Sequence, residues 1–364
     1  MTNSNYILYI LIALISLSLS LGCKTEKNNG GSNPDQAIEP AVITDATLTD
    51  TDDPAIWIHP ENSGSSLIIG TDKDPENGGL YAFDLNGKIQ QTHLGLKTAN
   101  NVDVAYGLNL NGQEVDIAVA TERYEHRLRV FSLPDLAPID GGGIPVFEDE
   151  EDDDYRQAMG IALYTRPSDQ AIFAIVSRKK GPEEGYLEQY LLQSNENGQV
   201  TGELVRTFGK YSGKKEIEAI AVDDKLGYVY YADEQAGIRK YFANPEKGNQ
   251  ELAFFGQGDF EKDQEGIAIY EVTDNTGYII VSDQEANLFN VYPREGTENA
   301  PHNHKKINSF ELSTNRTDGI EVTDQTLPDF PYGMFVAMSD DKTFHYYNWQ
   351  ELAERFGLEI KEND

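Results

Sequence analysis

The chain has 364 residues, of which 39% are hydrophobic and 10% aromatic, so it can form a folded core and is not an intrinsically disordered chain. It carries 29 Lys and Arg against 62 Asp and Glu, which gives a formal net charge of −33 at pH 7. This charge argues strongly against nucleic acid as a partner, because a phosphate backbone binds to a basic face. An anionic small substrate would need a local source of positive charge.

The first 23 residues predict export. An apolar run ends in small residues directly before Cys23, the single cysteine of the chain, as in a lipoprotein-type signal peptide with a lipid-accepting cysteine. Two features depart from that pattern: no Lys or Arg precedes the run, and Ser20 stands three residues before Cys23. A plain signal peptide or an uncleaved anchor helix is the alternative.

Three segments follow from this interpretation. Residues 1–23 are the predicted signal peptide, residues 24–40 a flexible polar tether, and residues 41–364 the folded domain. We expect a lipoprotein at a bacterial outer membrane or cell surface, held there only by an N-terminal lipid, or a periplasmic or secreted protein. We also expect it to be a monomer.

Six hairpin-like segments in the folded domain share one plan. Each has an apolar strand, a tight polar connection and a second strand with aromatic residues, and each follows another short strand. The hairpins span residues 66–85, 115–133, 171–192, 227–242, 277–294 and 332–349, and the preceding strands span residues 53–58, 101–108, 158–164, 217–223, 265–270 and 318–322. An interval of roughly 50 residues is in the range of propeller blades. The sequence therefore predicts an all-β fold, a six-bladed β-propeller; a pair of β-sandwiches is the alternative that the regular period disfavours.

The two ends of the folded domain have separate predictions. Residues 40–45 are apolar enough to form a strand that closes the ring by pairing with the last blade. Residues 348–360 have helical spacing, with Leu352, Phe356 and Ile360 on one face, and predict a short C-terminal helix.

Acidic residues stand at the start of five of the six inner strands. They are Asp53, Asp103, Glu218, Glu265 and Asp318, and the third blade has Met159 instead. Inner strands line the central channel of a propeller, so these carboxylates converge on one channel mouth, where they repel each other unless a cation balances them. Oxygen ligands without His or Cys favour Ca²⁺, and several ions rather than one. Five solvated strand-end acids in an acidic chain are the alternative.

A second set of residues occupies the connection inside each hairpin. Cations stand there in the first three blades, and oxygen ligands in the next two. The cations are Lys73, Arg123 and Lys179, with Lys180 adjacent, and the oxygen ligands are Glu234 and Gln284. Singly, such cations are usually solvated surface charges. Their clustering predicts a mouth with a basic side and a metal-binding side, which suits a substrate with several phosphates.

Other chemistries find little support. The acidic run at residues 148–155 lacks the Gly and the spaced ligands of an EF-hand loop, so we expect a solvated loop. The six His residues show no metal or triad spacing, and the GxSxG, P-loop and HExxH motifs do not occur. A covalent nucleophile is therefore unsupported.

Several motifs together resemble one family. They are "DDPAIWIHP", "GGLYAFDLNGK", "NNVDVAYGL", "GYLEQYLL", "IEAIAVDDKLGYVYYADE", "DQEGIAIY" and "TDGIEV". From about Asp52 to the final helix, the chain is similar to the β-propeller phytases. The resemblance implies a calcium-dependent phosphomonoesterase of the 3-phytase type. Such an enzyme hydrolyses phytate, myo-inositol hexakisphosphate, to lower inositol phosphates and phosphate by attack of a metal-activated water.

The resemblance also implies residue roles. The implied calcium ligands are Asp52, Asp53, Glu218, Glu234, Asp263, Glu265, Gln284 and Asp318. The implied catalytic residues are Lys73, Arg123, Lys179, Glu218 and Glu234. The implied substrate-binding residues are Lys73, Arg123, Lys179, Lys180, Asn101 and Asp103.

The chain departs from the family pattern at three places. Met159 replaces a tyrosine that commonly contacts phosphate, an Asp associated with a structural calcium is replaced within residues 311–316, and Lys180 stands where an acid can occur. Three other functions stay open: a phosphodiesterase, a calcium-dependent lactonase, and a non-catalytic binding propeller on the cell surface.

Overall fold

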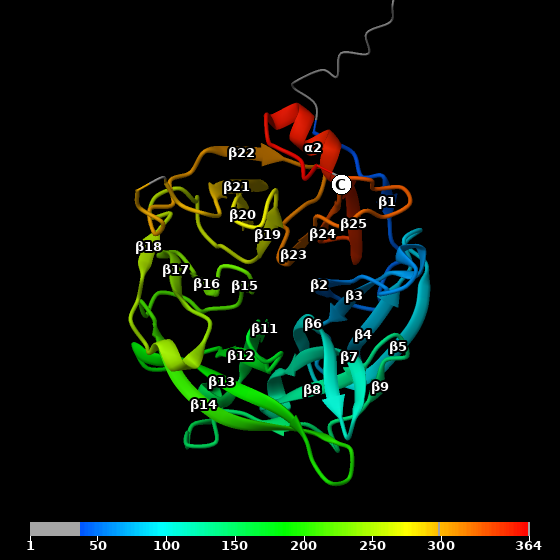
Figure 1. Cartoon of the computed structure of the whole chain (residues 1–364), viewed down its shortest axis with the longest axis vertical. Helices are drawn as coiled ribbons and strands as arrows, with labels where there is room; N and C mark the ends of the chain where they lie inside the picture. Colours follow the sequence, from blue (N-terminus) through cyan, green and yellow to red (C-terminus); the bar gives the residue numbers. More distant parts are fainter. Residues whose placement is uncertain (1–36, 298, 363–364) are drawn as a thin grey trace, which may run out of the picture. The chain divides into compact units, whose positions relative to one another are not determined.

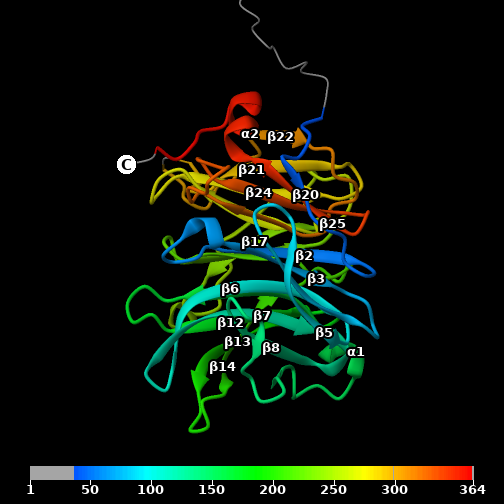
Figure 2. The same ribbon diagram turned by 90° about the vertical axis from the view of Figure 1, so that its right-hand side faces the viewer.

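The computed structural model describes residues 37–297 and 299–362. Their strands form six antiparallel sheets set as blades around a central axis, so the predicted six-bladed β-propeller is confirmed (Figure 1). Figure 2 shows the blades from the side, with strands of successive blades stacked across the view. The predicted signal peptide, Cys23 and residues 24–36 of the predicted tether lie outside the described residues, and export stays a prediction. Among the described residues, no helix is both long and apolar enough to span a membrane.

The first three blades come from the first half of the domain. Blade 1 is made of β2 (Thr51–Trp57), β3 (Leu67–Asp72), β4 (Gly78–Phe83) and β5 (Ile89–Leu96). Blade 2 is made of β6 (Ala99–Leu110), β7 (Gln113–Glu122), β8 (Arg127–Ser132), β9 (Ala137–Pro138) and β10 (Ile144–Pro145). Blade 3 is made of β11 (Ala158–Thr165), β12 (Ile172–Arg178), β13 (Glu184–Ser194) and β14 (Val200–Lys210).

The last three blades complete the ring. Blade 4 is made of β15 (Ile220–Asp223), β16 (Tyr228–Asp233), β17 (Gly237–Phe242) and β18 (Ala253–Phe255). Blade 5 is made of β19 (Ile267–Glu271), β20 (Gly277–Asp283), β21 (Leu288–Pro293) and β22 (Asn308–Glu311). Blade 6 is made of β23 (Ile320–Thr323), β24 (Met334–Ser339), β25 (Thr343–Asn348) and β1 (Val42–Ile43). The innermost strands contact their neighbours in succession, and β2 contacts β23.

The ring is closed by the N-terminal strand, as predicted. β1 pairs antiparallel with β25, with Val42 opposite Tyr346 and Ile43 opposite His345. Blade 6 therefore contains strands from both ends of the domain, and the channel mouth is complete only when this pairing forms.

Apolar side chains fill the spaces between blades. Every residue of β3 and of β24 is buried, because neighbouring blades cover both faces of each sheet. Between blades 2 and 3, for example, Ile117 and Val119 of β7 belong to the same buried cluster as Ile161 and Ala174. This packing explains why the second strand of each blade has a continuous apolar run rather than strict alternation.

The C-terminal helix is shorter than predicted. α2 spans Trp349–Phe356; the Asn348 side chain accepts a hydrogen bond from the backbone N–H of Gln350, and Gly357 ends the helix with φ of 69°. Glycine adopts this left-handed conformation without strain, so Ile360 lies beyond the helix. A further short helix, α1 (Asp153–Arg156), forms within the acidic run that was expected to be a loop.

Four carboxylates line the central channel beyond its mouth. Asp53, Asp103, Asp224 and Glu321 border a cavity of about 180 Å³. Burial raises the pKa of Asp103 to about 6 and that of Asp224 to about 7, although each carboxylate accepts a backbone hydrogen bond from blade 3. Burial likewise raises the pKa of Asp53 and Glu321.

The Asp224→Asn variant should become more stable relative to the natural protein as pH rises from 4 to 8 in EDTA. The pKa of Asp224 is near 3.8 in the unfolded state and about 7 in the folded state, so the folded state holds the proton more tightly. The free energy of unfolding of the natural protein therefore falls as the pH rises from 4 to 8. At about 1.4 kcal/mol per pKa unit, the difference should reach at most roughly 4 kcal/mol, measured by urea unfolding at each pH. The exposed Asp329→Asn variant is the control. A stability difference that does not change with pH would contradict this assignment.

Candidate active site

Strand pairing defines equivalent positions in the six blades. In each blade we take one pair of opposite residues, one on the innermost strand (the inner member) and one on the strand next to it (the outer member), at the same place along the blade. These pairs are Pro54↔Gly70, Val102↔Ala120, Ile161↔Val176, Ile220↔Tyr231, Ile267↔Val281 and Ile320↔Ala337. The residue two positions before the inner member of each pair belongs to what we call the mouth ring. The mouth ring consists of Asp52, Asn100, Met159, Glu218, Glu265 and Asp318.

The predicted equivalence of Asp53 and Asp103 with Glu218 is therefore wrong. Asp53 lies one residue, and Asp103 three residues, beyond the mouth-ring position of its blade. In both inner strands a register shift directly precedes the paired residue, between Thr51 and Pro54 and between Ala99 and Val102, and β11 has the same shift between Ala158 and Ile161. The wrong assignment came from matching the two Asp residues to Glu218 by residue type, whereas strand pairing sets each at a different distance from the paired residue of its blade.

Asp53 and Asp103 consequently lie in the channel instead of the mouth ring. Asp53 accepts a hydrogen bond from the backbone N–H of Val102 at 3.1 Å, and Asp103 accepts one from Leu163 at 2.7 Å. Asn101 is also buried, and its side-chain oxygen accepts a hydrogen bond from Asn100 at 2.8 Å. Direct contact of Asn101 and Asp103 with a substrate at the mouth is therefore not supported by their positions.

The equivalence of the five hairpin residues is confirmed. Each hairpin residue comes three positions after the outer member of the pair in its blade. Its backbone N–H donates a hydrogen bond to the carbonyl oxygen of the residue four positions before the inner member. These hydrogen bonds join Lys73 to Asp50, Arg123 to Thr98, Lys179 to Gln157, Glu234 to Glu216 and Gln284 to Asp263 at 2.8–3.2 Å. The same backbone hydrogen bond thus brings each hairpin residue to the mouth.

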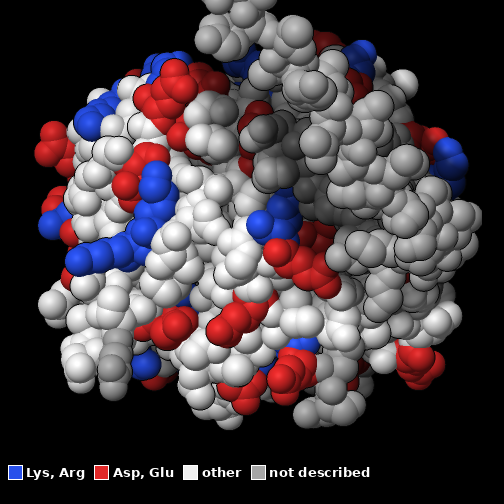
Figure 3. Space-filling model, turned by 90° about the horizontal axis from the view of Figure 1, so that it is seen from above, with Lys and Arg blue, Asp and Glu red and all other residues white. Residues whose placement is uncertain are grey.

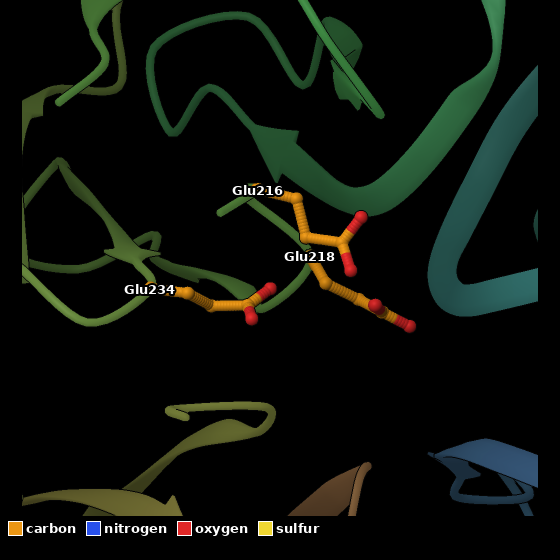
Figure 4. Close-up of side chains that lie close together, drawn as sticks. All are labelled: Glu216, Glu218 and Glu234. Atoms are coloured by element: carbon orange, nitrogen blue, oxygen red, sulfur yellow. The ribbon is translucent and has the colours of Figure 1, made fainter. Parts of the chain in front are cut away.

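Two groups of three buried carboxylates lie at the mouth. One carboxylate oxygen from each of Glu216, Glu218 and Glu234 lies within 4.8 Å of the others, and the same holds for Glu234, Asp263 and Glu265. In Figure 4 the side chains of the first group extend toward one another. Glu216 and Glu218 precede β15, and Glu234 follows β16, so the groups are assembled from short segments at strand ends.

Sequence reasoning missed Glu216, although a signal for it existed. Glu216 is equivalent to the predicted Asp263, because each stands two residues before a mouth-ring acid, in "EIE" and in "DQE". Side chains two residues apart in an extended segment point to the same side. An acid at both positions therefore doubles the number of carboxylates at one point of the mouth.

Lysines at the mouth already form ion pairs with acidic residues there, and two of these lysines contact more than one acid. Lys73 Nζ lies 3.0 Å from Asp52 and 2.8 Å from Asp318. Lys215, which sequence reasoning also missed, lies 2.8 Å from Glu234 Oε2, 2.9 Å from Asp263 Oδ2 and 2.9 Å from Glu265 Oε1. The carboxylates raise the pKa of both lysines against the opposing effect of burial.

The two lysines do not balance the acidic groups. Burial, and next the charge of Glu265, raise the pKa of Glu234 to about 10. Burial, and next the charge of Glu218, raise the pKa of Glu265 to about 8. Burial also opposes ionisation of Asp263, but its hydrogen bonds, that from Lys215 foremost, outweigh burial and lower its pKa. Without further positive charge, Glu234 and Glu265 therefore hold protons near neutral pH.

The carboxylate groups fit a hard divalent cation. Glu234 has no exposed surface, and its Oε1 has no hydrogen-bond partner among the described residues. The donors are all oxygen atoms, and two oxygens on opposite sides of a Ca²⁺ ion at about 2.4 Å lie about 4.8 Å apart. Glu216, Glu218, Glu234, Asp263 and Glu265 would hold such ions.

Two of the four predicted cations border these groups. Lys179 pairs with Glu216, and the Arg123 guanidinium donates to Asn100, whose amide donates to Glu218 at 2.6 Å. Lys73 lies on the opposite side of the mouth ring, between Asp52 and Asp318. Gln284 donates to Asp318.

Lys180 has a different position. Its ammonium pairs with Asp154 of α1 at 2.5 Å, and its side chain is more than half exposed. On the face that Figure 3 shows, basic and acidic side chains lie beside each other and form no large patch of one sign. The organised separation of charge is a property of the mouth.

Buried carboxylate groups bordered by cations at one channel mouth of a propeller are compatible with a bound metal ion and a phosphate ligand. The family model described as Phytase matches residues 7–357, so the chain belongs to the phytase family of hydrolases. It is 30% identical over 366 aligned residues to the 3-phytase of Bacillus subtilis (strain 168), covering 96% of this chain and 91% of that protein. It also resembles the solved β-propeller domain of Myceliophteria thermophila Cps50 (Swd1). That likeness has 10% identity and a TM-score of 0.47 over 82% of this chain and 83% of the other, too distant to bear on the argument.

The Glu234→Gln variant should lose calcium affinity while keeping its metal-free stability. Glutamine mimics the protonated carboxyl that Glu234 carries without metal, but it removes one anionic ligand. We expect calcium binding, measured calorimetrically, to weaken by about tenfold or more. Urea unfolding in EDTA should give nearly the natural free energy. The exposed Glu203→Gln variant, on β14, is the control. Unchanged calcium affinity would show that Glu234 is not a ligand.

Proposed function

We propose that the chain is a calcium-dependent phosphomonoesterase that hydrolyses phytate to lower inositol phosphates, as a 3-phytase-type enzyme. The observation that carries the proposal is that basic side chains contact the buried carboxylate groups at the mouth. Buried carboxylate groups with an unpartnered oxygen lie against Lys179 and, through Asn100, against Arg123. This arrangement offers a metal-binding side and a phosphate-binding side within one mouth. Family membership and the 3-phytase relative support the same substrate.

The basic residues would bind the phosphoryl group. Lys73, Arg123 and Lys179 each point a positive group into or beside the mouth ring and are held there by acidic or amide partners. Phosphate-ester hydrolysis depends mainly on positioning and on stabilising the charge of the phosphoryl oxygens. When substrate phosphate replaces these partners, the three cations stabilise the equatorial oxygens.

The carboxylates have a second task. When bound, Ca²⁺ acts as a Lewis acid toward phosphoryl oxygen and water and cancels the repulsion among its ligands. Glu234 belongs to both carboxylate groups, and Glu218 belongs to the first and lies close enough for its charge to raise the pKa of Glu265 in the second. These two side chains are therefore the best placed to accept a proton from the attacking water. Gln284 orients Asp318 by its hydrogen bond.

The overall charge agrees with this function once the mouth is considered separately. A chain with net charge −33 repels phytate at long range. Metal ions at the carboxylate groups would make the mouth locally positive, so the acidic chain would still have a site that attracts anions.

EDTA should abolish phosphate release from phytate, and added Ca²⁺ should restore it. The carboxylates without metal repel the substrate and leave water unactivated. The measurement compares phosphate release from phytate with hydrolysis of a phosphodiester and a lactone, each with Ca²⁺ and with EDTA. Full activity in EDTA would overturn the metal-dependent mechanism. Faster turnover of the diester or the lactone would favour those alternative hydrolases, and no turnover of any substrate would favour a binding propeller.

The Lys73→Ala variant should lower kcat/KM for phytate by about 10²–10³-fold in saturating calcium, the typical cost of removing one group that stabilises transition-state charge. Lys88→Ala is the matched control, since Lys88 pairs with Asp45 on the surface. Melting temperatures in calcium check that both variants fold. An effect no larger than that of Lys88→Ala would remove Lys73 from the site.

A further inference from the structure

The ammonium of Lys215 lies at the centre of one carboxylate group. Its Nζ is within 2.9 Å of one oxygen from each of Glu234, Asp263 and Glu265. These are the same three residues whose oxygens lie close enough to hold a metal ion. The ammonium donates hydrogen bonds to Asp263 and Glu265 and forms an ion pair with Glu234. Lys215 therefore occupies the place that a cation bound by this group would take.

One ammonium satisfies this group only in part. Both oxygens of Glu234 are buried without a hydrogen-bond partner among the described residues. Oε2 forms an ion pair with Lys215 at 2.8 Å, whereas Oε1 is left free. A second ammonium, that of Lys262, lies 3.2 Å from Asp263 Oδ2, but its side chain is 54% exposed, so solvent screens its charge. When all three carboxylates are ionised, they carry more negative charge than Lys215 and this exposed ammonium offset. A divalent ion at the same point would contact the free oxygen as well and supply a second positive charge.

Lys215 can leave this place more easily than its partners can. Its side chain is 32% exposed, whereas those of Glu234, Asp263 and Glu265 are 0%, 3% and 6% exposed. The ammonium sits on a flexible four-carbon chain. Two cations cannot share the space between the same three oxygens, because their mutual repulsion at that distance is strong. Metal binding therefore requires the ammonium to move out toward solvent.

We propose that Lys215 and a divalent cation exchange at the group formed by Glu234, Asp263 and Glu265. Lys215 is thus a positioning residue: it holds the three carboxylates together without metal and sets the calcium concentration at which metal replaces it. This inference rests on the proposed function for the identity of the metal. It goes beyond that function by assigning a built-in competitor to one metal site.

The Lys215→Met variant tests the exchange. Methionine keeps most of the side-chain volume but cannot compete for the carboxylates. Calorimetric titration of the EDTA-stripped, dialysed protein with CaCl₂ should show a Kd at least about tenfold lower than in the natural protein. The metal-free variant should melt at a lower temperature, because its carboxylates repel each other, and calcium should raise its melting temperature more.

Lys214→Met is the matched control. Lys214 is the neighbouring exposed lysine, and its ammonium donates to the carbonyl oxygen of Gln235 at 2.6 Å. The substitution removes the same net charge, so it should leave calcium affinity nearly unchanged. If Lys215→Met does not fold in EDTA, calcium-induced refolding followed by circular dichroism supplies its affinity.

The outcomes separate this inference from the proposed function. If Lys215→Met binds calcium no more tightly than the natural protein, or if Lys214→Met gains as much calcium affinity as Lys215→Met, the exchange is overturned. Calcium-dependent phytate hydrolysis would be unaffected by either result. No calcium binding by the natural protein or by Lys215→Met would overturn the metal-dependent function and the exchange with it. A gain confined to Lys215→Met supports the exchange whether or not phytate proves to be the substrate.

Discussion

The structure of the mouth depends on the repulsion among carboxylates that the strand ends of four blades bring to one axis. Glu218, Glu234, Glu265 and Asp318 are each buried, and burial makes an unbalanced negative charge costly. Lys73 and Lys215 offset part of this charge, and protons on Glu234 and Glu265 offset more. The remaining demand for positive charge supports the proposed affinity for calcium and, through calcium, the proposed binding of phosphate by an acidic chain.

The ring architecture explains how the two sides of the site arise from one repeat. The hairpin position carries a cation in blades 1 to 3 and an oxygen ligand in blades 4 and 5. Because one backbone hydrogen bond holds this position in all five blades, the side chain alone decides whether the position brings a cation or an oxygen donor to the mouth. Closure by β1 then sets blade 6, with Asp318, beside blade 1, with Lys73. The site is therefore a property of the closed ring and of no single blade.

Much of the fold and part of the site were predictable. The apolar runs and their regular interval predicted the blades and the closing strand, and the hairpin residues were aligned correctly. Asp53 and Asp103 were misplaced, because they were matched to Glu218 by residue type, whereas strand pairing, which only the structure shows, sets each at a different distance from the paired residue of its blade. Lys180 was grouped with Lys179 from adjacency alone, but neighbours in an extended chain point to opposite sides, and Lys180 pairs with Asp154.

The sequence by itself determined the number of blades, the excess of acid, and the hairpin positions of Lys73, Arg123, Lys179 and Glu234. These features depend on local periodicity and composition, which every short segment carries. Only the tertiary structure decided which acids meet, since Glu216 and Glu265 approach Glu234 from different blades. It likewise revealed that Lys215 lies among three carboxylates. Contacts between segments about 20 to 50 residues apart depend on register and ring closure, and these are set by packing across blades rather than by any local pattern.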